Sequence, residues 1–116
     1  MNKVFTLSFD DGVTQDQRFI TLLKKYNLTC TFNLNSEFLG LKGEIMQEGN
    51  IIVPQNKNAA EEVARIYGGF EVAAHTRTHP MLTSLSPAQI VEEIVGDYLK
   101  LSELVGYPVR GMAYPG

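Results

Sequence analysis

Short apolar runs alternate with segments of helical periodicity along this chain. Residues 3–9, 28–34 and 70–74 are dominated by apolar and β-branched side chains. Runs of this length and composition are typical of strands buried in a parallel sheet. After the first run, apolar side chains recur at helical spacing: Phe19, Leu22, Leu23 and Tyr26. A strand, a helix and a second strand within about 30 residues form the βαβ unit of a parallel sheet.

Two helices have boundaries that the sequence predicts from capping residues. The first is expected to begin at Thr14, with Gln17 completing a capping box, and to end at Asn27, since asparagine tolerates the left-handed conformation. The second is expected to be capped by Asn58, with Glu61 three residues on, and to end at Gly68 and Gly69.

The third helix has the clearest start in the chain. Residues 86–89 read Ser-Pro-Ala-Gln, which combines a cap, a proline at the first helical position and a capping-box glutamine. Val91, Val95 and Tyr98 mark the face that is expected to cover the sheet, and Gly106 should end the helix.

The order of these elements predicts an α/β fold with a parallel sheet. A further strand is expected to start at residues 111–113, and residues 35–54 are expected to form a long loop with an insertion. With 116 residues, the chain is long enough for one domain, residues 1–116. In such folds, functional sites collect at the carboxyl ends of the strands.

Composition and charge narrow the function classes. The chain is 44% hydrophobic, with a formal net charge of −3 and a single cysteine, Cys30, expected to be a small buried strand residue. An acidic balance argues against nucleic-acid binding, and no apolar run approaches the roughly 20 residues that span a bilayer. No leader sequence is visible, so a cytoplasmic location is the default expectation.

Two adjacent carboxylates, Asp10 and Asp11, follow the first apolar run and precede Gly12. Such a sequence is ordinary turn chemistry, and a plain turn is one interpretation. The other is functional: successive side chains diverge, so one carboxylate can ligate a metal while its neighbour acts as a general base.

Both histidines of the chain, His75 and His79, follow the third apolar run. Four residues apart, they would lie on one face of a helical turn and could bind one metal ion. They could also be two unrelated polar residues after a strand. Their position at a strand end, and the fact that they are all the histidine in the chain, favour the metal site.

A last cluster, residues 110–116, holds Arg110 and Tyr114. Arg110 could be a solvated surface cation, or could orient a carboxylate and keep it ionised. The Tyr-Pro-Gly sequence from Tyr114 could be a turn, or could present a backbone N–H to a developing oxyanion.

Together the clusters suggest a divalent metal held by Asp11, His75 and His79, with Asp10 as the general base. Two neutral histidines and a carboxylate suit zinc, and cobalt or nickel would also fit. Such a site predicts metal-assisted hydrolysis of an amide or ester.

Three motifs in this order resemble the first three motifs of the polysaccharide deacetylases, a carbohydrate esterase group acting on chitin, chitooligosaccharides and peptidoglycan. They are residues 8–12, Ser-Phe-Asp-Asp-Gly; residues 75–79, His-Thr-Arg-Thr-His; and the segment 110–116. The resemblance implies a distorted (β/α) barrel, a divalent metal, commonly zinc, and removal of N-acetyl or O-acetyl groups from carbohydrates.

The same resemblance implies roles for single residues. Asp10 would be the base, Asp11, His75 and His79 the metal ligands. Thr76 would support the histidine loop by hydrogen bonding, Arg110 would hold Asp10, and a backbone N–H near Tyr114 would help to stabilise the oxyanion.

The resemblance covers about the first half of the family's barrel. The family's tryptophan-containing motif and its late Leu-x-His motif, which supplies the general acid, have no counterpart here, since the chain lacks tryptophan and has no histidine after His79. Pro115 also precedes Gly116 directly, where the family usually has an intervening aromatic residue. A partial barrel with open edges is expected to self-associate. The alternatives are a same-fold amidase acting on a small non-sugar amide, and a catalytically silent metal-binding or assembly fragment.

Overall fold

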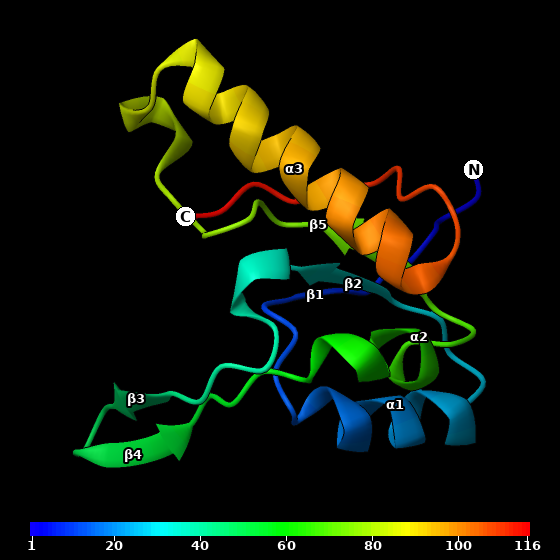
Figure 1. Ribbon diagram of the computed structural model, residues 1–116. Helices are drawn as coiled ribbons and strands as arrows, with labels where there is room; N and C mark the ends of the chain where they lie inside the picture. Colours follow the sequence, from blue (N-terminus) through cyan, green and yellow to red (C-terminus); the bar gives the residue numbers. More distant parts are fainter.

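The computed structural model describes all 116 residues and has a three-stranded parallel sheet at its centre (Figure 1). The sheet order is β1-β2-β5, and its strands are β1 Ser8–Asp10, β2 Thr31–Leu34 and β5 Glu71–Ala74. Helices α1 (Asp16–Lys25) and α2 (Val63–Ile66) lie on one side of the sheet, and α3 (Pro87–Val105) lies on the other. The predicted α/β fold with parallel strands is confirmed.

The strands are shorter than the apolar runs that predicted them, most of all β1. It was expected to start at Lys3, but it starts at Ser8 and has only one neighbour, β2. Residues before Leu7 have no partner strand, and Val4 and Phe5 are exposed. The expectation that this run is covered on both faces is therefore wrong, because β1 is an edge strand in this structure.

The core forms where β2 and β5 pack against the helices. Phe32 and Leu34 of β2 are fully buried, and the Phe32 ring lies 4.9 Å from that of Tyr67, centroid to centroid. Cys30 is buried as expected. On the other side of the sheet, Leu101 of α3 is fully buried.

Helix α3 follows its sequence signals, but the face it buries differs from the prediction. Ser86 accepts from the Gln89 N–H and the Gln89 side chain accepts from the Ser86 N–H, so the predicted capping box is confirmed, as is the left-handed Gly106 that ends the helix. Val91 and Val95 are exposed, whereas Asp97 and Leu101 are buried. Of the predicted stripe, Tyr98 packs against the core as expected, but the buried position beside it is taken by the Asp97 carboxylate, and Val91 and Val95 face solvent.

The other two predicted caps are wrong. The Thr14 hydroxyl contacts the Gln15 side chain, and α1 begins at Asp16 without a side-chain cap. Gln17 donates instead to the side-chain oxygen of Asn58. Asn58 makes tertiary contacts and does not cap α2. A 3-10 turn at Ala60–Glu62 comes directly before α2. The predicted helix ends agree with expectation, since Asn27 after α1 and Gly69 after α2 are both left-handed.

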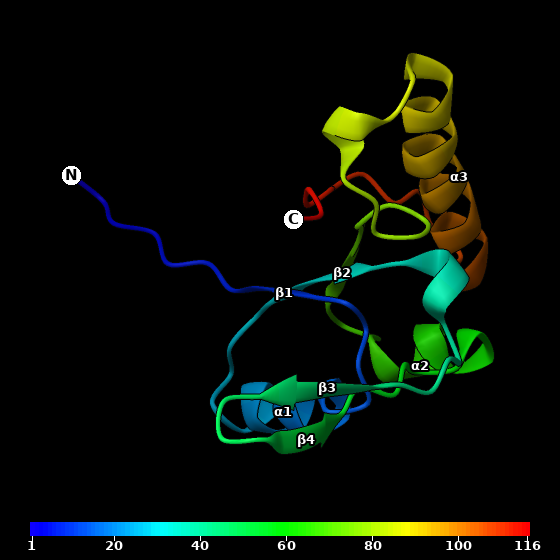
Figure 2. The same cartoon turned by 90° about the vertical axis from the view of Figure 1, so that its left-hand side faces the viewer.

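The segment expected to be a long loop contains an antiparallel hairpin. Strands β3 (Glu44–Gln47) and β4 (Ile51–Pro54) pair with each other and project away from the sheet (Figures 1 and 2). Gly49 and Asn50 both adopt left-handed conformations in the connecting turn, which lets the strands reverse direction. The predicted strand at residues 111–113 is reduced to one parallel bridge between Met112 and Ala74.

A buried polar network joins α1, α2 and the loop after β1. The Tyr67 hydroxyl donates to Asp16 Oδ2 at 2.6 Å, and Asn58 Nδ2 donates to the Tyr67 oxygen and to the Val13 carbonyl, each at 3.0 Å. The Asn58 N–H donates to the Gly12 carbonyl. Burial raises the pKa of Asp16 to about 6, although the Tyr67 hydrogen bond partly opposes that rise.

This raised pKa predicts a pH-dependent cost to stability. The folded state binds the Asp16 proton more tightly than the unfolded state, so Asp16 favours folding below pH 4 and loses that contribution as pH rises through about 6. Asp16→Asn keeps an acceptor for Tyr67 without a charge. It should raise the free energy of unfolding at pH 8 by roughly 1–2 kcal/mol and give no gain at pH 4. Urea unfolding at both pH values measures this, and an equal effect at both would contradict it.

Candidate functional site

Two strand ends place the acidic pair and the histidines near each other. Asp10 is the last residue of β1, and His75 follows directly after β5. Strand β2 pairs in parallel with both, with Asp10 opposite Asn33 and Ala74 opposite Leu34. The carboxyl ends of the strands therefore meet at one edge of the sheet.

The loop 75–79 brings both histidines to this edge without forming a helical turn. Thr76 and His79 have positive φ angles of 69° and 53°, so the prediction of a helical turn is wrong. The left-handed residues fold the loop back on itself, and the His75 and His79 rings lie 4.8 Å apart, centroid to centroid. The predicted pairing of the two side chains is nevertheless present.

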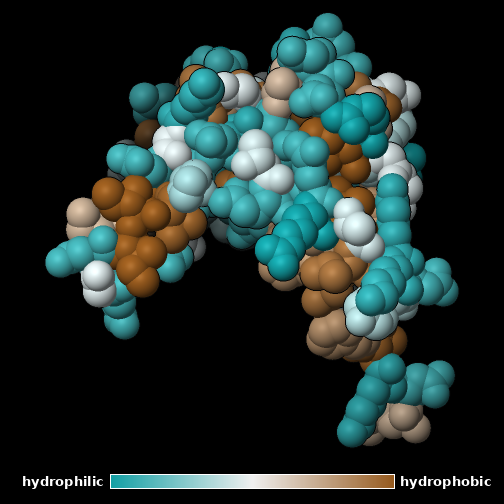
Figure 3. All heavy atoms as spheres, turned by 90° about the horizontal axis from the view of Figure 1, so that it is seen from below, coloured by the Kyte–Doolittle hydropathy of each residue, from teal (hydrophilic) through white to brown (hydrophobic).

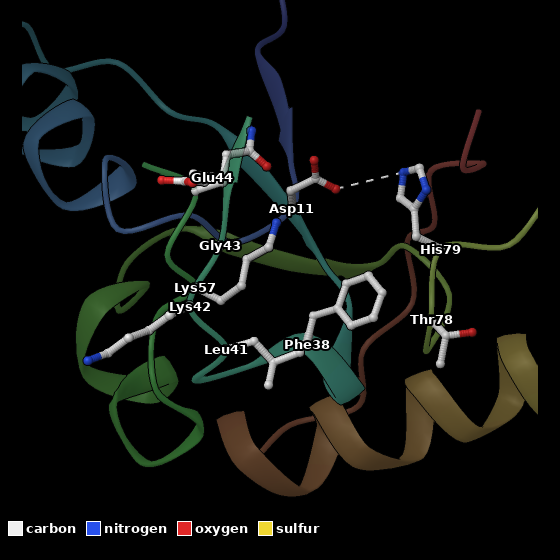
Figure 4. A pocket seen from close by; sticks show the side chains of 10 residues that line it. Asp11, Phe38, Leu41, Lys42, Gly43, Glu44, Lys57, Thr78 and His79 are labelled. Carbon is white, nitrogen blue, oxygen red and sulfur yellow. Dashed lines mark ion pairs between the residues drawn. The ribbon is translucent and has the colours of Figure 1, made fainter. Parts of the chain in front are cut away.

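Asp11, His75 and His79 form the one cluster of this kind in the structure. One ligand atom from each lies within 4.8 Å of the others. Asp11 Oδ1 is 3.6 Å from His75 Nε2 and 3.8 Å from His79 Nε2. Figure 4 shows the Asp11 carboxylate facing the His79 ring across the mouth of a pocket.

These three residues fit a divalent metal by their chemistry and spacing. Zinc bonds of about 2.0–2.1 Å in tetrahedral geometry separate two ligand atoms by roughly 3.4 Å. The observed separations of 3.6 and 3.8 Å are close to that value. Three protein ligands would leave a coordination position for water or substrate.

His75 is oriented by a backbone carbonyl. Its ring is 2% exposed, and Nδ1 lies 3.0 Å from the Ala113 oxygen. A carbonyl only accepts, so Nδ1 carries the proton in the neutral ring and Nε2 presents its lone pair to the acidic pair. This arrangement, a ligand histidine donating its other N–H, is common in metal sites. The Ala113 carbonyl therefore orients the His75 ring, a role that the sequence did not predict.

Asp10 is oriented by a residue that the sequence reasoning missed. Asn33 is 2% exposed, and its Nδ2 donates to Asp10 Oδ1 at 2.8 Å and to Ser8 Oγ at 2.7 Å. Asp10 Oδ2 is left 3.8 Å from His75 Nε2. An asparagine inside the apolar run 31–34, opposite Asp10 in the parallel register, is the signal that could have identified it.

The other predicted site residues are placed differently. Arg110 is exposed and the structure does not bring its guanidinium to Asp10; its carbonyl accepts from the Tyr98 hydroxyl. A catalytic role for Arg110 stays a prediction. Tyr114 is 77% exposed at the end of the chain. Thr76 takes part in hydrogen bonding through its backbone: its carbonyl accepts from Asn35 Nδ2, whereas its hydroxyl is buried without a protein partner.

A pocket of about 460 Å³ opens beside the cluster (Figure 4). Asp11 and His79 lie at one wall, and Phe38 and Leu41 supply the apolar part of its lining. The root of the hairpin closes the opposite side; the remaining lining residues are Lys42, Gly43, Glu44, Gln55, Lys57 and Thr78. A ligand in this pocket would touch Asp11 and His79 directly.

The structure contains no helix with the length and apolar character needed to cross a membrane.

Comparison with known proteins agrees with the three motifs. The chain is 34% identical over 105 residues to chitin deacetylase 3 of Cryptococcus neoformans, which covers 90% of this chain and 22% of that protein. Among solved structures, the Streptococcus pyogenes deacetylase PplD superposes with a TM-score of 0.78 at 22% identity, over 99% of this chain and 47% of that one.

IcaB from Ammonifex degensii superposes equally well, with a TM-score of 0.78 at 24% identity, and the match covers 99% of this chain and 51% of that one. The chain thus spans about a fifth of the length of the curated relative and about half of the solved ones. The family model for polysaccharide deacetylase matches residues 1–116, so the chain belongs to the polysaccharide deacetylase family.

Proposed function

We propose that this chain carries the metal-binding half of an active centre that removes acetyl groups from N-acetylated or O-acetylated carbohydrates. The observation that carries the proposal is the cluster of Asp11, His75 and His79 beside a separately oriented Asp10. Membership of the polysaccharide deacetylases and the similarity to a chitin deacetylase supply the substrate class. The 116 residues then correspond to the N-terminal portion of the catalytic domain.

Asp10 and Asp11 are assigned different roles. Asp11, His75 and His79 would hold the metal, with zinc as the proposed ion and cobalt or nickel as substitutes. A bound ion of this kind lowers the pKa of a water molecule and polarises an acyl carbonyl. Asp10 points its Oδ2 toward the same space, fixed there by Asn33, and accepts the proton of the attacking water.

The segment after Met112 supports the reacting carbonyl. The Ala113 N–H is bonded to the Ala74 carbonyl, but the Tyr114 N–H has no backbone acceptor. We assign that free N–H to the developing oxyanion, as a donor fixed in place before the reaction. The substrate's sugar ring would lie in the pocket beside Phe38 and Leu41, where apolar side chains face the ligand cluster.

The leaving amine also needs a proton, and neither histidine is free to give it. Both are assigned as metal ligands, and the chain has no others. A positioned general acid typically contributes 10²–10⁴-fold to the rate. We therefore infer that these residues alone give slow turnover.

Metal binding is the first test of this assignment. His79→Ala and Asp11→Asn should each weaken zinc binding at least tenfold, because each removes one of three protein ligands. Asp10→Asn should change the affinity less than threefold, because Asp10 is assigned to the proton. Titration calorimetry on the purified chain measures all three, with Glu103→Gln on the far end of α3 as a control. Equal zinc affinity for wild type and His79→Ala would contradict the ligand set.

Turnover is the second test. Acetate release from N-acetylated chitooligosaccharides in the presence of zinc should exceed that of the Asp10→Asn variant, at a rate about 10²–10⁴-fold below that of enzymes with a general acid. A parallel assay with a small formamide and a cyclic imide distinguishes the same-fold amidase. If wild type and Asp10→Asn give equal rates on the oligosaccharides, the formamide and the cyclic imide, with zinc bound, only the silent metal-binding alternative is left.

We also propose that the chain self-associates. Strand β1 is an edge with one side unpaired, and an unpaired edge is a template for another strand. Apolar side chains gather on the exposed hairpin, at left in Figure 3, and include Ile45, Met46, Ile51 and Ile52. Exposed apolar surface of this kind is buried when copies associate.

Sedimentation over a tenfold range of concentration should therefore show reversible growth in mass. Phe5→Lys, at an exposed position just before β1, should shift the distribution toward the monomer, since an edge lysine blocks pairing. A wild-type chain that stays monomeric throughout would refute the self-association proposal.

A further inference from the structure

The loop that carries both histidines has little internal structure to hold its shape. Residues 75–79 belong to no helix or strand, and two of them, Thr76 and His79, are non-glycine residues in the left-handed region. Such conformations persist only where the surroundings impose them. Asn35 Nδ2 donates to the His75 and Thr76 carbonyls, and a second set of contacts comes from one face of α3.

Asp97 makes the deepest of these contacts. Its side chain is fully buried, Oδ2 accepts from the His75 N–H at 2.9 Å, and Oδ1 accepts from the Ser36 N–H at 2.8 Å. The His75 N–H is shared with the Leu34 carbonyl at 3.0 Å. A buried carboxylate is costly unless it is hydrogen-bonded. Both oxygens of Asp97 accept from backbone N–H groups, of His75 just after β5 and of Ser36 just after β2.

Glu93, one helical turn earlier, makes the corresponding contact with the other half of the loop. Its Oε2 accepts from the Thr78 N–H at 2.9 Å, and its Oε1 accepts from the Thr78 hydroxyl at 2.7 Å. The Glu93 carbonyl accepts from the Arg77 N–H at 3.1 Å. Residues four apart share a helix face. Glu93 and Asp97 therefore bond to the loop from the same face of α3, on either side of Arg77.

Between these two residues, α3 has a glycine where the loop comes closest. A Cβ added at Gly96 would lie 2.6 Å from Arg77 Cδ, so the Arg77 stem crosses the helix at this position. Its guanidinium then pairs with Glu92 at 2.9 Å and with Glu37 at 3.0 Å. The close approach accounts for a glycine inside a helix, where it otherwise weakens the structure.

We infer that α3 presets the metal-ligand loop, and that Asp97 and Glu93 are positioning residues for His75 and His79. Asp97 fixes the backbone from which the buried histidine projects, and Glu93 fixes the residue next to the exposed one. The inference rests on the proposed metal site, since it says how that site keeps its geometry before an ion arrives. Neither carboxylate takes part as a ligand.

The test separates loop geometry from metal binding by measuring both. In metal-free protein, the His75 and Ser36 amides should exchange slowly with solvent. Asp97→Asn should accelerate exchange of one of these two amides at least tenfold, because the side-chain NH2 that replaces one carboxylate oxygen is a donor and cannot accept from the N–H facing it. The same variant should weaken zinc binding at least tenfold in calorimetry. Glu93→Gln, at a partly exposed contact, should weaken zinc binding by about threefold and accelerate Thr78 exchange.

Two controls separate positioning from general stability. Leu101→Val shortens a side chain of α3 in the hydrophobic core, so it should lower the unfolding midpoint and leave zinc affinity unchanged. Glu92→Gln removes only an exposed ion pair and should change neither quantity measurably.

Unchanged zinc affinity in both Asp97→Asn and Glu93→Gln would overturn the inference, and so would an equal loss in Leu101→Val. Glu93→Gln keeps the test decisive if Asp97→Asn fails to fold. A wild-type chain that binds no zinc would refute the metal site instead, and the exchange rates would then decide the positioning role independently.

Discussion

The parallel pairing of β1, β2 and β5 is the constraint on which the site depends. Pairing Asp10 with Asn33 and Leu34 with Ala74 brings the acidic pair and His75 to the same edge of the sheet. A slip of one residue in either pair would turn the side chains to the opposite face. The register is fixed by burial, because Phe32 and Leu34 can be covered by the core in only one alignment.

The two ends of the sheet differ in the polarity of their buried residues. Toward the amino ends of the strands, the interior is apolar, with Cys30, Phe32 and Val72 buried. Beyond the carboxyl ends, the buried residues are mostly polar. They are Asn33, Asn35, His75, Thr76 and Asp97. Buried polar groups are costly unless they are hydrogen-bonded, and Asn35 and Asp97 bond to the backbone of the histidine loop. The Thr76 hydroxyl is the exception, buried without a protein partner.

The sequence predicts most of the fold and the ligand cluster, because both depend on local signals. Apolar runs mark the strands, the capping box at Ser86 marks α3, and the carboxylates and histidines follow strands directly. What it does not predict depends on tertiary contact. The hairpin has a turn signal in Gly49-Asn50, but its strands are short and mostly exposed, so no buried apolar pattern marks them. Thr14 and Asn58 lose their predicted caps to nearby or tertiary partners. The buried face of α3 is only partly predicted, because the charged Asp97 lies on it beside Tyr98.

The same reasoning explains why the histidine loop could not be derived from its spacing. A spacing of four positions between the two histidines suits a helical turn. Such a turn needs hydrogen bonds within its own backbone, and here those backbone groups bond to other parts of the chain. The His75 N–H goes to Leu34 and Asp97, and the Thr78 N–H goes to Glu93. An external scaffold replaces internal hydrogen bonds, so the loop can adopt left-handed residues that a helix excludes. The geometry of the cluster is consequently a property of α3 and β5 together, although the atoms at its centre come from the loop and from Asp11.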